Sequence, residues 1–182
     1  MKLINRWALM RNTSNENLSE HSFEVSIIAH ALAIIAKEKF NKDINPEKVA
    51  VMGLYHDCSE ILTGDMPTPV KYHNPIIREA YQEIERAAEE TMLSYLPDYM
   101  KNYLEDYLIY SEACAYEWQL VKAADKIGAL IKCIQEKMAG NTEFIKAEQA
   151  IKKNLETLAC KEADVFIQDF LHSYRLTIDE LD

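Results

Sequence analysis

One stretch of the sequence, residues 19 to 40, repeats apolar side chains with the period of an α-helix. The apolar positions recur at short helical spacings and are Val25, Ile27, Ile28, Ala31, Leu32, Ile34 and Ile35. Such a repeat places the apolar side chains on one broad face of a helix. We therefore expect a long helix with Ser19 as its N-cap, and we expect this face to be buried against other helices.

Helix-start signals recur along the rest of the chain, and turn-forming residues are scarce. Asn45-Pro46 and Asn74-Pro75 each combine a capping side chain with a proline at the first helical position. Only 4 Gly and 5 Pro occur among 182 residues, which favours long helices over a turn-rich sheet. The pattern predicts further helices over residues 2–11, 98–110, 115–139 and 142–170, and no convincing strand. We predict an all-α protein with a single domain over residues 1–182, in which a core of about 3–141 carries the motifs and the C-terminal helices cover about 142–182.

The overall composition argues against several classes of protein. The formal net charge is −10, so a broad surface for a nucleic acid polymer, which would be basic, is not expected. The N-terminus does not have the long apolar stretch of a signal peptide, and no run of 18 apolar residues predicts a membrane span. The four cysteines form no CxxC pair, which suits free buried thiols in a reducing compartment. We expect a cytoplasmic protein with no membrane partner.

Residue types that bind metals cluster in the segment from Gly53 to Pro69. His56 and Asp57 are adjacent, and Glu60 follows shortly after, so on a continuous helix Glu60 would lie over the pair. An imidazole and a carboxylate suit a divalent transition metal such as Mn, Co or Zn. A His-Asp pair also arises by chance at the end of a core helix, where a backbone carbonyl satisfies the imidazole. A metal site therefore needs ligands from elsewhere in the chain.

Two such candidates lie on other predicted helices. His21 lies at the N-terminal end of the apolar face of the 19–40 helix. Asp125 lies in an otherwise apolar stretch, where a carboxylate is costly unless it is paired or bound to a metal. A salt bridge with Lys122 or Lys126 would also satisfy Asp125. Two imidazoles and two carboxylates together would make a site that leaves coordination positions for water and substrate.

A His, a later His-Asp and a still later Asp on an all-α chain resemble the HD-domain metal-dependent phosphohydrolases. The sequence is most similar to the bacterial HD-domain 5′-deoxynucleotidases, which remove phosphate from deoxyribonucleoside 5′-monophosphates. The segments that carry this likeness include Arg6-Trp7, Ser19-Glu20-His21-Ser22, Tyr55-His56-Asp57, Thr63-Gly64-Asp65 and Pro67-Thr68-Pro69-Val70-Lys71-Tyr72. The likeness covers about residues 3–141 and implies an HD-type helical bundle.

The resemblance also implies roles for individual residues. It implies a divalent transition metal ion, such as Co or Mn, held by four side chains: His21, His56, Asp57 and Asp125. Arg6 would lie near the phosphate, Trp7 against the sugar, and Asp65 and Thr68 in a substrate loop, while His21 would also contact the substrate. Arg6 and Glu60 would be the catalytic residues, with Glu60 as the acid/base or water-orienting group.

These roles lead us to expect in-line attack of water on phosphorus, with the 5′-oxygen of the deoxyribonucleoside leaving. Trp7 against C2′ would exclude a 2′-hydroxyl, and Asp65 would accept a hydrogen bond from the 3′-hydroxyl. Two other functions stay open: an HD hydrolase of a triphosphate or cyclic diester, and a non-catalytic nucleotide or metal sensor. The resemblance favours a homodimer, as does a stripe of tyrosines that would pack either in the core or between subunits: Tyr99, Tyr103, Tyr107 and Tyr110.

Overall fold

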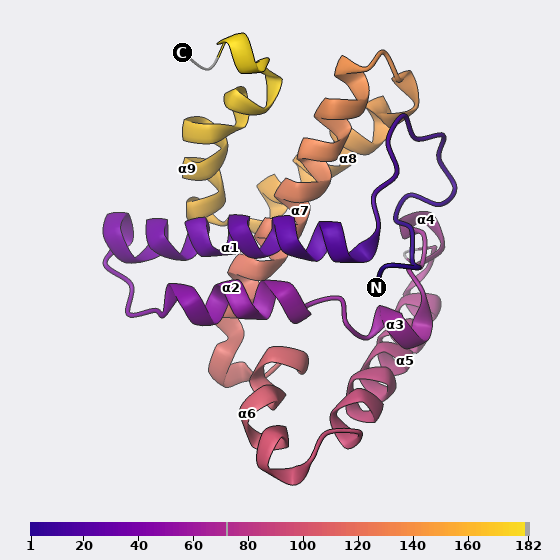
Figure 1. Cartoon of the computed structure of the whole chain (residues 1–182), viewed down its shortest axis with the longest axis vertical. Helices are drawn as coiled ribbons and strands as arrows, with labels where there is room; N and C mark the ends of the chain where they lie inside the picture. The colour runs from indigo at the N-terminus through magenta and orange to yellow at the C-terminus, as the bar shows by residue number, and fades with distance from the viewer. Residues whose placement is uncertain (72, 181–182) are drawn as a thin grey trace.

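The computed structural model describes residues 1–71 and 73–180, and the described residues form a helical bundle (Figure 1). The α-helices are α1 (Leu18–Phe40), α2 (Pro46–Tyr55), α3 (Glu60–Thr63), α4 (Thr68–Lys71), α5 (Pro75–Ser94), α6 (Asp98–Leu108), α7 (Ala115–Met138), α8 (Ile145–Leu158) and α9 (Lys161–Phe170). Short 3-10 segments are η1 (Glu112–Cys114), η2 (Thr142–Phe144), η3 (Leu171–Arg175) and η4 (Ile178–Glu180). Within the described residues the only strand-like pairing is an isolated antiparallel bridge between Asn5 and Asn17. The predicted all-α class is confirmed.

The centre of the fold is a layer made by α1 and α2, which α7 crosses (Figure 1). Fully buried side chains from all three helices, such as Leu32, Met52 and Ile127, fill the space between them. Gly53 permits the close approach of α1 and α2, because a Cβ at this position would lie 2.9 Å from the Cα of Ser26. The end of α2 is thereby held next to the first turns of α1.

Helices α8 and α9 lie at one end of the molecule and α5 and α6 toward the other, with α3 and α4 at one side (Figure 1). Helices α8 and α9 pack on α7, and α9 also packs on α1. Helices α5 and α6 lie at the opposite end, where α5 contacts α3, α4 and α6. Buried Tyr81 of α5 donates a hydrogen bond to the carbonyl oxygen of Gly64, at 3.3 Å, and so ties α5 to the loop after α3.

The cap-and-proline signals are confirmed at α2 and α5, where Asn45 and Asn74 accept hydrogen bonds from backbone amides of the first turn. The predicted cap of α1 is wrong. Asn17, not Ser19, is the N-cap, and it forms a capping box with Glu20. This box satisfies amides of the first turn that Ser19 would have left without a partner.

The helix predicted over residues 2–11 is also wrong, because this segment folds as turns. Its order comes from contacts with a distant segment. The amide of Arg6 donates to the carbonyl oxygen of Glu16, and the amide of Leu18 donates to that of Ile4, both at 2.9 Å. Leu3 and Leu9 are exposed, whereas Trp7 and Met10 pack against the core, so only part of the apolar residues of this segment is buried.

Other boundaries differ from the sequence pattern. The helix predicted over 142–170 is interrupted, because Ala159 adopts a left-handed conformation (φ 50°) and ends α8. Helix α6 ends at Leu108 rather than at residue 110. Ile27 and Ile34, expected on the buried face of α1, are 55% and 41% exposed, because the bundle covers a narrower face than the apolar pattern suggested.

Several smaller expectations have clear outcomes. All four cysteines are free and buried, as predicted. By length and composition alone, α1 is apolar enough to cross a membrane, but 56% of its most apolar window is buried inside the fold, as in a core helix. The acidic tail is exposed at Thr177, Asp179 and Glu180. Leu181 and Asp182, and Tyr72 of the motif beginning at Pro67, lie outside the described residues.

Candidate metal centre

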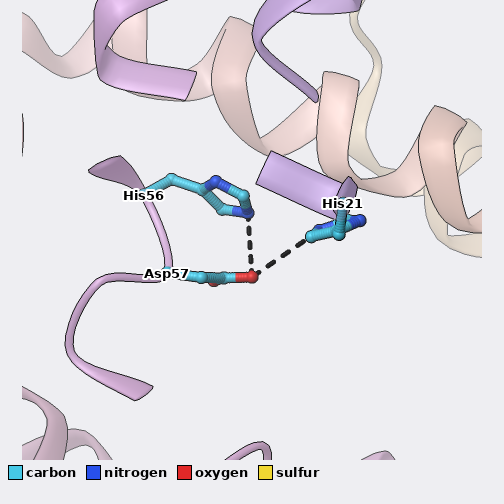
Figure 2. A group of neighbouring side chains, drawn as sticks. All are labelled: His21, His56 and Asp57. Carbon is cyan, nitrogen blue, oxygen red and sulfur yellow. Dashed lines mark ion pairs between the residues drawn. The ribbon is translucent and has the colours of Figure 1, made fainter. Parts of the chain in front are cut away.

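The four predicted metal ligands come together from three parts of the chain. His21 lies in the first turns of α1, His56 and Asp57 lie in the turn after α2, and Asp125 lies in the middle of α7. Figure 2 shows the carboxylate of Asp57 directed toward the imidazoles of His21 and His56. The crossing of α1, α2 and α7 is therefore what assembles this group.

The distances within the group are those of a compact site. Oδ2 of Asp57 lies 3.0 Å from Nε2 of His56 and 3.6 Å from Nε2 of His21 (Figure 2). Nε2 of His21 also lies 3.2 Å from Oδ1 of Asp125. One ligand atom each from His21, His56 and Asp57 lie within 4.8 Å of one another, close enough to share one metal ion.

The donor set fits a divalent transition metal. Both Nε2 atoms, of His21 and His56, are buried and lack an aligned hydrogen-bond partner among the described residues. Nδ1 of His56 lies 2.8 Å from the carbonyl oxygen of Gly53, which can only accept, so Nδ1 carries a proton and Nε2 is the ring nitrogen that faces the other candidate ligands. Buried nitrogens of this kind beside two carboxylates are ligands that suit Zn, Mn or Co.

The imidazole of His56 and the carboxylate of Asp57 each stabilise the charged form of the other. Burial alone would raise the pKa of Asp57, but the neighbouring His56 lowers it to about 2. Burial alone would lower the pKa of His56, but the carboxylate of Asp57 raises it to about 9. A metal ion that binds here must therefore displace a proton from His56, so metal affinity will depend on pH.

Asp125 forms one of the two salt bridges that the sequence left open, the one with Lys126, and its other oxygen lies beside a candidate metal ligand. Its Oδ2 is 2.7 Å from Nζ of Lys126, and its Oδ1 faces His21. Burial alone would raise the pKa of Asp125, but Lys126 and His21 hold it well below its usual range. The salt bridge with Lys126 thus keeps the carboxylate ionised and leaves its other oxygen beside His21, a candidate metal ligand.

Arg6 lies against the same carboxylates. Its Nη1 is 3.4 Å from Oδ2 of Asp57, and its Nη2 is 3.7 Å from Oδ1 of Asp125. These contacts are long for charged hydrogen bonds, so the guanidinium is held by surrounding negative charge rather than by tight bidentate bonds. Donors of Arg6 are therefore available to bind an anion beside the candidate metal ligands.

Trp7 has an unusual backbone conformation and a well-defined environment. Its φ of 57° is left-handed, which is rare for a bulky residue and is typical of functional sites. The indole packs against Phe144 with ring centroids 5.2 Å apart, and its Nε1 donates to Oε2 of Glu16 at 3.2 Å. The side chain is thus fixed next to Arg6.

Glu60 does not lie on one continuous helix with His56, as the sequence pattern had suggested. The chain forms turns between Tyr55 and Glu60, and Glu60 begins α3. Its side chain is nevertheless buried, and its Oε2 has no hydrogen-bond partner among the described residues. Burial, with added repulsion from Asp57 and Asp65, raises the pKa of Glu60 to about 8.

The two predicted residues of the substrate loop differ in their surroundings. Asp65 is partly buried, and burial raises its pKa although the positive charge of Arg6 opposes this effect. Thr68 begins α4 and is exposed. Asp65 is therefore electrostatically part of the group around Arg6, whereas Thr68 lies at the surface.

Glu16 is a member of this group that the sequence did not reveal. Its Oε1 lies 3.2 Å from Nδ1 of His21 and 3.5 Å from Nε of Arg6. It lies in the polar loop before α1, where no helical period applies. A carboxylate five residues before His21 gave no signal of its own.

The fold matches solved HD-domain proteins. An HD-domain phosphohydrolase from Listeria innocua superposes with a TM-score of 0.81 at 23% identity, over 95% of this chain and 83% of that one. A cyanophage S-2L HD phosphohydrolase, solved with dA and one catalytic Zn²⁺ ion, superposes with a TM-score of 0.65 at 18% identity, over 97% and 93%. These likenesses define the class of the fold, which is that of the HD-domain phosphohydrolases.

Sequence relatives define the family within this class. Residues 1–174 match the family described as 5′-deoxynucleotidase YfbR-like. A 5′-deoxynucleotidase from Vibrio atlanticus is 48% identical over 181 residues, covering 100% of this chain and 93% of that protein. One from Yersinia pestis is 46% identical over 184 residues, covering 100% and 92%. The chain belongs to the YfbR-like 5′-deoxynucleotidase family, as its motifs predicted.

Proposed function

We propose that the protein is a metal-dependent 5′-deoxynucleotidase, which hydrolyses deoxyribonucleoside 5′-monophosphates to a deoxyribonucleoside and phosphate. The observation that carries this proposal is the convergence of the four candidate ligands beside Arg6, a cation able to hold a phosphate. Membership of the YfbR-like family and relatives named 5′-deoxynucleotidase support it.

His21, His56, Asp57 and Asp125 would hold the metal ion. When bound, a divalent ion lowers the pKa of its water and withdraws charge from the phosphoryl oxygens. Co, Mn and Zn all suit these nitrogen and oxygen donors. The identity of the ion is part of the test below.

Arg6 would hold the non-bridging oxygens of the phosphate. Its planar set of N–H donors matches two phosphate oxygens at once, which a lysine cannot do. Burial alone would lower the pKa of Arg6, but Asp125, Asp57 and Glu16 raise it, so the guanidinium is always charged. Its position beside Asp57 would align phosphorus with the water that attacks it.

Glu60 would transfer the proton that the reaction needs. Burial raises its pKa to about 8, and a cation held by the neighbouring ligands would lower this value again. The two effects bring the pKa of Glu60 toward neutrality, where a carboxyl group both gives and takes protons efficiently. The leaving 5′-oxygen of the deoxyribonucleoside is the group that would receive this proton.

Selection of the sugar is assigned to three residues. Trp7 would occupy the space beside C2′, Asp65 would accept a hydrogen bond from the 3′-hydroxyl, and Thr68 would belong to the same loop. The fixed position of the Trp7 indole, packed on Phe144 and bonded to Glu16, supports a steric role. A rigid ring excludes an extra hydroxyl better than a mobile one does.

The test is a phosphate-release assay with deoxy-AMP, AMP, deoxy-ATP and 3′-AMP, each with Mn²⁺, Co²⁺, Mg²⁺ or EDTA. We expect release from deoxy-AMP with Mn²⁺ or Co²⁺ and loss of release in EDTA, because the bound ion would lower the pKa of the attacking water and withdraw charge from the phosphate. Preference for deoxy-ATP would instead indicate a triphosphate hydrolase, and binding without turnover would indicate a sensor. Full activity in EDTA, with metal analysis showing no bound ion, would contradict the metal mechanism.

Trp7→Ala is expected to narrow the difference in kcat/KM between deoxy-AMP and AMP. If the indole excludes the 2′-hydroxyl, its removal hurts AMP less than deoxy-AMP. Some stability is lost as well, but less than the roughly 3–5 kcal/mol of a fully buried large-to-small change, because Trp7 is only partly buried. The measurement is the ratio of the two kcat/KM values. An unchanged ratio would assign Trp7 to packing, and Asp65→Ala is the control, since both sugars carry the 3′-hydroxyl.

We also propose that the protein is a cytoplasmic homodimer whose residues 1–182 form one domain. Exposed tyrosines support the dimer: Tyr99 and Tyr103 on α6 are 82% and 79% exposed, whereas Tyr107 packs against the core. Contacts of α8 and α9 with α7 support a single domain. Sedimentation equilibrium is expected to give twice the chain mass of 21.0 kDa, and a monomer at micromolar concentration would contradict the dimer.

A further inference from the structure

Glu16 contacts three of the side chains to which the proposed function gives a role. Its Oε1 lies 3.5 Å from Nε of Arg6 and 3.2 Å from Nδ1 of His21, and its Oε2 accepts a hydrogen bond from Nε1 of Trp7 at 3.2 Å. Only 13% of its side chain is exposed. A single carboxylate therefore connects a candidate metal ligand, the candidate phosphate-binding arginine and the indole beside the sugar.

The loop that carries Glu16 is held at both ends. On one side, the carbonyl oxygen of Glu16 accepts a hydrogen bond from the amide of Arg6 at 2.9 Å. On the other side, the amide of Thr13 donates to Oε2 of Glu136 on α7, also at 2.9 Å. The backbone of Glu16 is thus fixed relative to α7, which carries Asp125, and its side chain has little freedom to move away.

His21 needs a partner on the side where Glu16 lies. Its Nε2 faces Asp57 and Asp125, so the metal would bind this nitrogen, and its Nδ1 faces Glu16. A histidine that ligates a metal usually donates its other N–H to a carboxylate or carbonyl, which fixes the ring and raises its basicity. Nδ1 of His21 and Oε1 of Glu16 lie 3.2 Å apart, which is hydrogen-bonding distance, although they are not aligned as a hydrogen bond.

We propose that Glu16 is a positioning residue, which holds the His21 ring with Nε2 toward the metal and holds Arg6 and Trp7 beside it. This role rests on the proposed function only in taking His21 as a metal ligand. A purely structural Glu16 would instead anchor the N-terminal segment and leave metal affinity unchanged. Glu143 offers the matched control, because it anchors the same segment through Arg11, at an exposed position away from the ligands.

The experiment titrates the metal-depleted full-length chain with Co²⁺ and records the dissociation constant and the visible absorption spectrum of the bound ion. Glu16→Ala is expected to weaken Co²⁺ binding about 10- to 100-fold and to alter the spectrum. Glu16→Gln should restore most of the affinity, because its amide oxygen accepts from Nδ1 of His21. Glu16→Asp keeps the charge but is one methylene shorter, so it should also weaken Co²⁺ binding. This variant tests the positioning role if Glu16→Ala fails to fold. Glu143→Ala should bind Co²⁺ as the wild type does.

The outcomes separate the two proposals. Wild-type affinity in Glu16→Ala or Glu16→Asp would overturn the positioning role and leave the proposed function intact. If Glu143→Ala and Glu16→Ala lose the same amount of Co²⁺ affinity, the effect is general anchoring of the N-terminal segment. If Glu16→Gln and Glu16→Ala lose the same amount, the effect is one of charge alone. Either result overturns the positioning role. A wild-type chain that neither binds Co²⁺ nor releases phosphate from deoxy-AMP would overturn both.

Discussion

Replacing Asp57 by asparagine is expected to lower kcat/KM for deoxy-AMP by about three orders of magnitude or more while leaving the helical fold intact. Asp57 lies between the two imidazoles and beside Arg6, with its Oδ2 3.0 Å from Nε2 of His56 and 3.4 Å from Nη1 of Arg6. A neutral amide has nearly the same shape but is a poor metal ligand, so the variant would lose the ion whose stabilisation of the transition state amounts to several kcal/mol. The measurements are phosphate release, metal content and far-UV circular dichroism.

Asp106→Asn is the control for this substitution. Asp106 pairs with Lys48 near the surface, where its side chain is 47% exposed, and it lies apart from the candidate ligands. We expect this variant to keep wild-type turnover. Near-normal turnover in Asp57→Asn, at saturating metal, would contradict the assignment of His56 and Asp57 as the core of the site.

The grouping of the candidate metal ligands could be predicted from the sequence, because most of these residues lie in segments that obey local rules. His21 and Asp125 lie in long apolar repeats, where a polar side chain is conspicuous and demands a partner. The fold then brings these helices together through close packing, as at Gly53. Periodicity predicted that most of these apolar residues face inward, with Ile27 and Ile34 as exceptions, and the resemblance to a family indicated which polar residues belong together.

The N-terminal segment could not be predicted in the same way. Its residues gain order from contacts with the loop before α1 and with α7, so its local sequence preference does not decide its conformation. The left-handed Trp7 illustrates this, because such a conformation persists only where the surroundings fix it. Glu16 could not be predicted for the same reason, because its contacts with Arg6, Trp7 and His21 form only in the folded chain and follow no helical period.

The N-cap of α1 was predicted wrongly for a different reason. Asn17 and Glu20 carry the spacing of a capping box, and this signal was present in the sequence. Ser19 is also a residue type that caps helices, but the helix begins before it, at Leu18. The capping box is the better guide, because two side chains satisfy backbone amides reciprocally, and a single serine satisfies only one.

The largest effect on stability is expected at Glu136, which is buried on α7 and forms an ion pair with buried Lys132. Glu136→Ala should lower the free energy of unfolding by about 3–5 kcal/mol, because it leaves the ammonium group of Lys132 buried without its counter-ion. The amide of Thr13 and the side chain of Asn141 also lose their acceptor. Urea denaturation followed by circular dichroism measures the loss. The exposed pair of Lys39 and Asp169 provides the control, since Asp169→Ala should cost no more than about 1 kcal/mol.

The buried pair of Glu136 and Lys132 should also make the stability of the fold depend on pH, and the stability lost in Glu136→Ala should be restored by a second substitution. Burial alone would raise the pKa of Glu136, but hydrogen bonds from Lys132, Thr13 and Asn141 lower it to about 2 from its usual 4.5. A carboxylate with a lowered pKa stabilises the fold fully above about pH 4.5, and this contribution is lost as the pH falls toward 2, because the unfolded chain then binds the proton first. The stability difference between wild type and Glu136→Ala should therefore shrink over that range.

Replacing both partners, as Lys132→Met with Glu136→Leu, should recover most of the loss because no buried charge remains. A double variant no more stable than Glu136→Ala would show that the lost bonds to Thr13 and Asn141, rather than the unpaired charge of Lys132, cause the destabilisation.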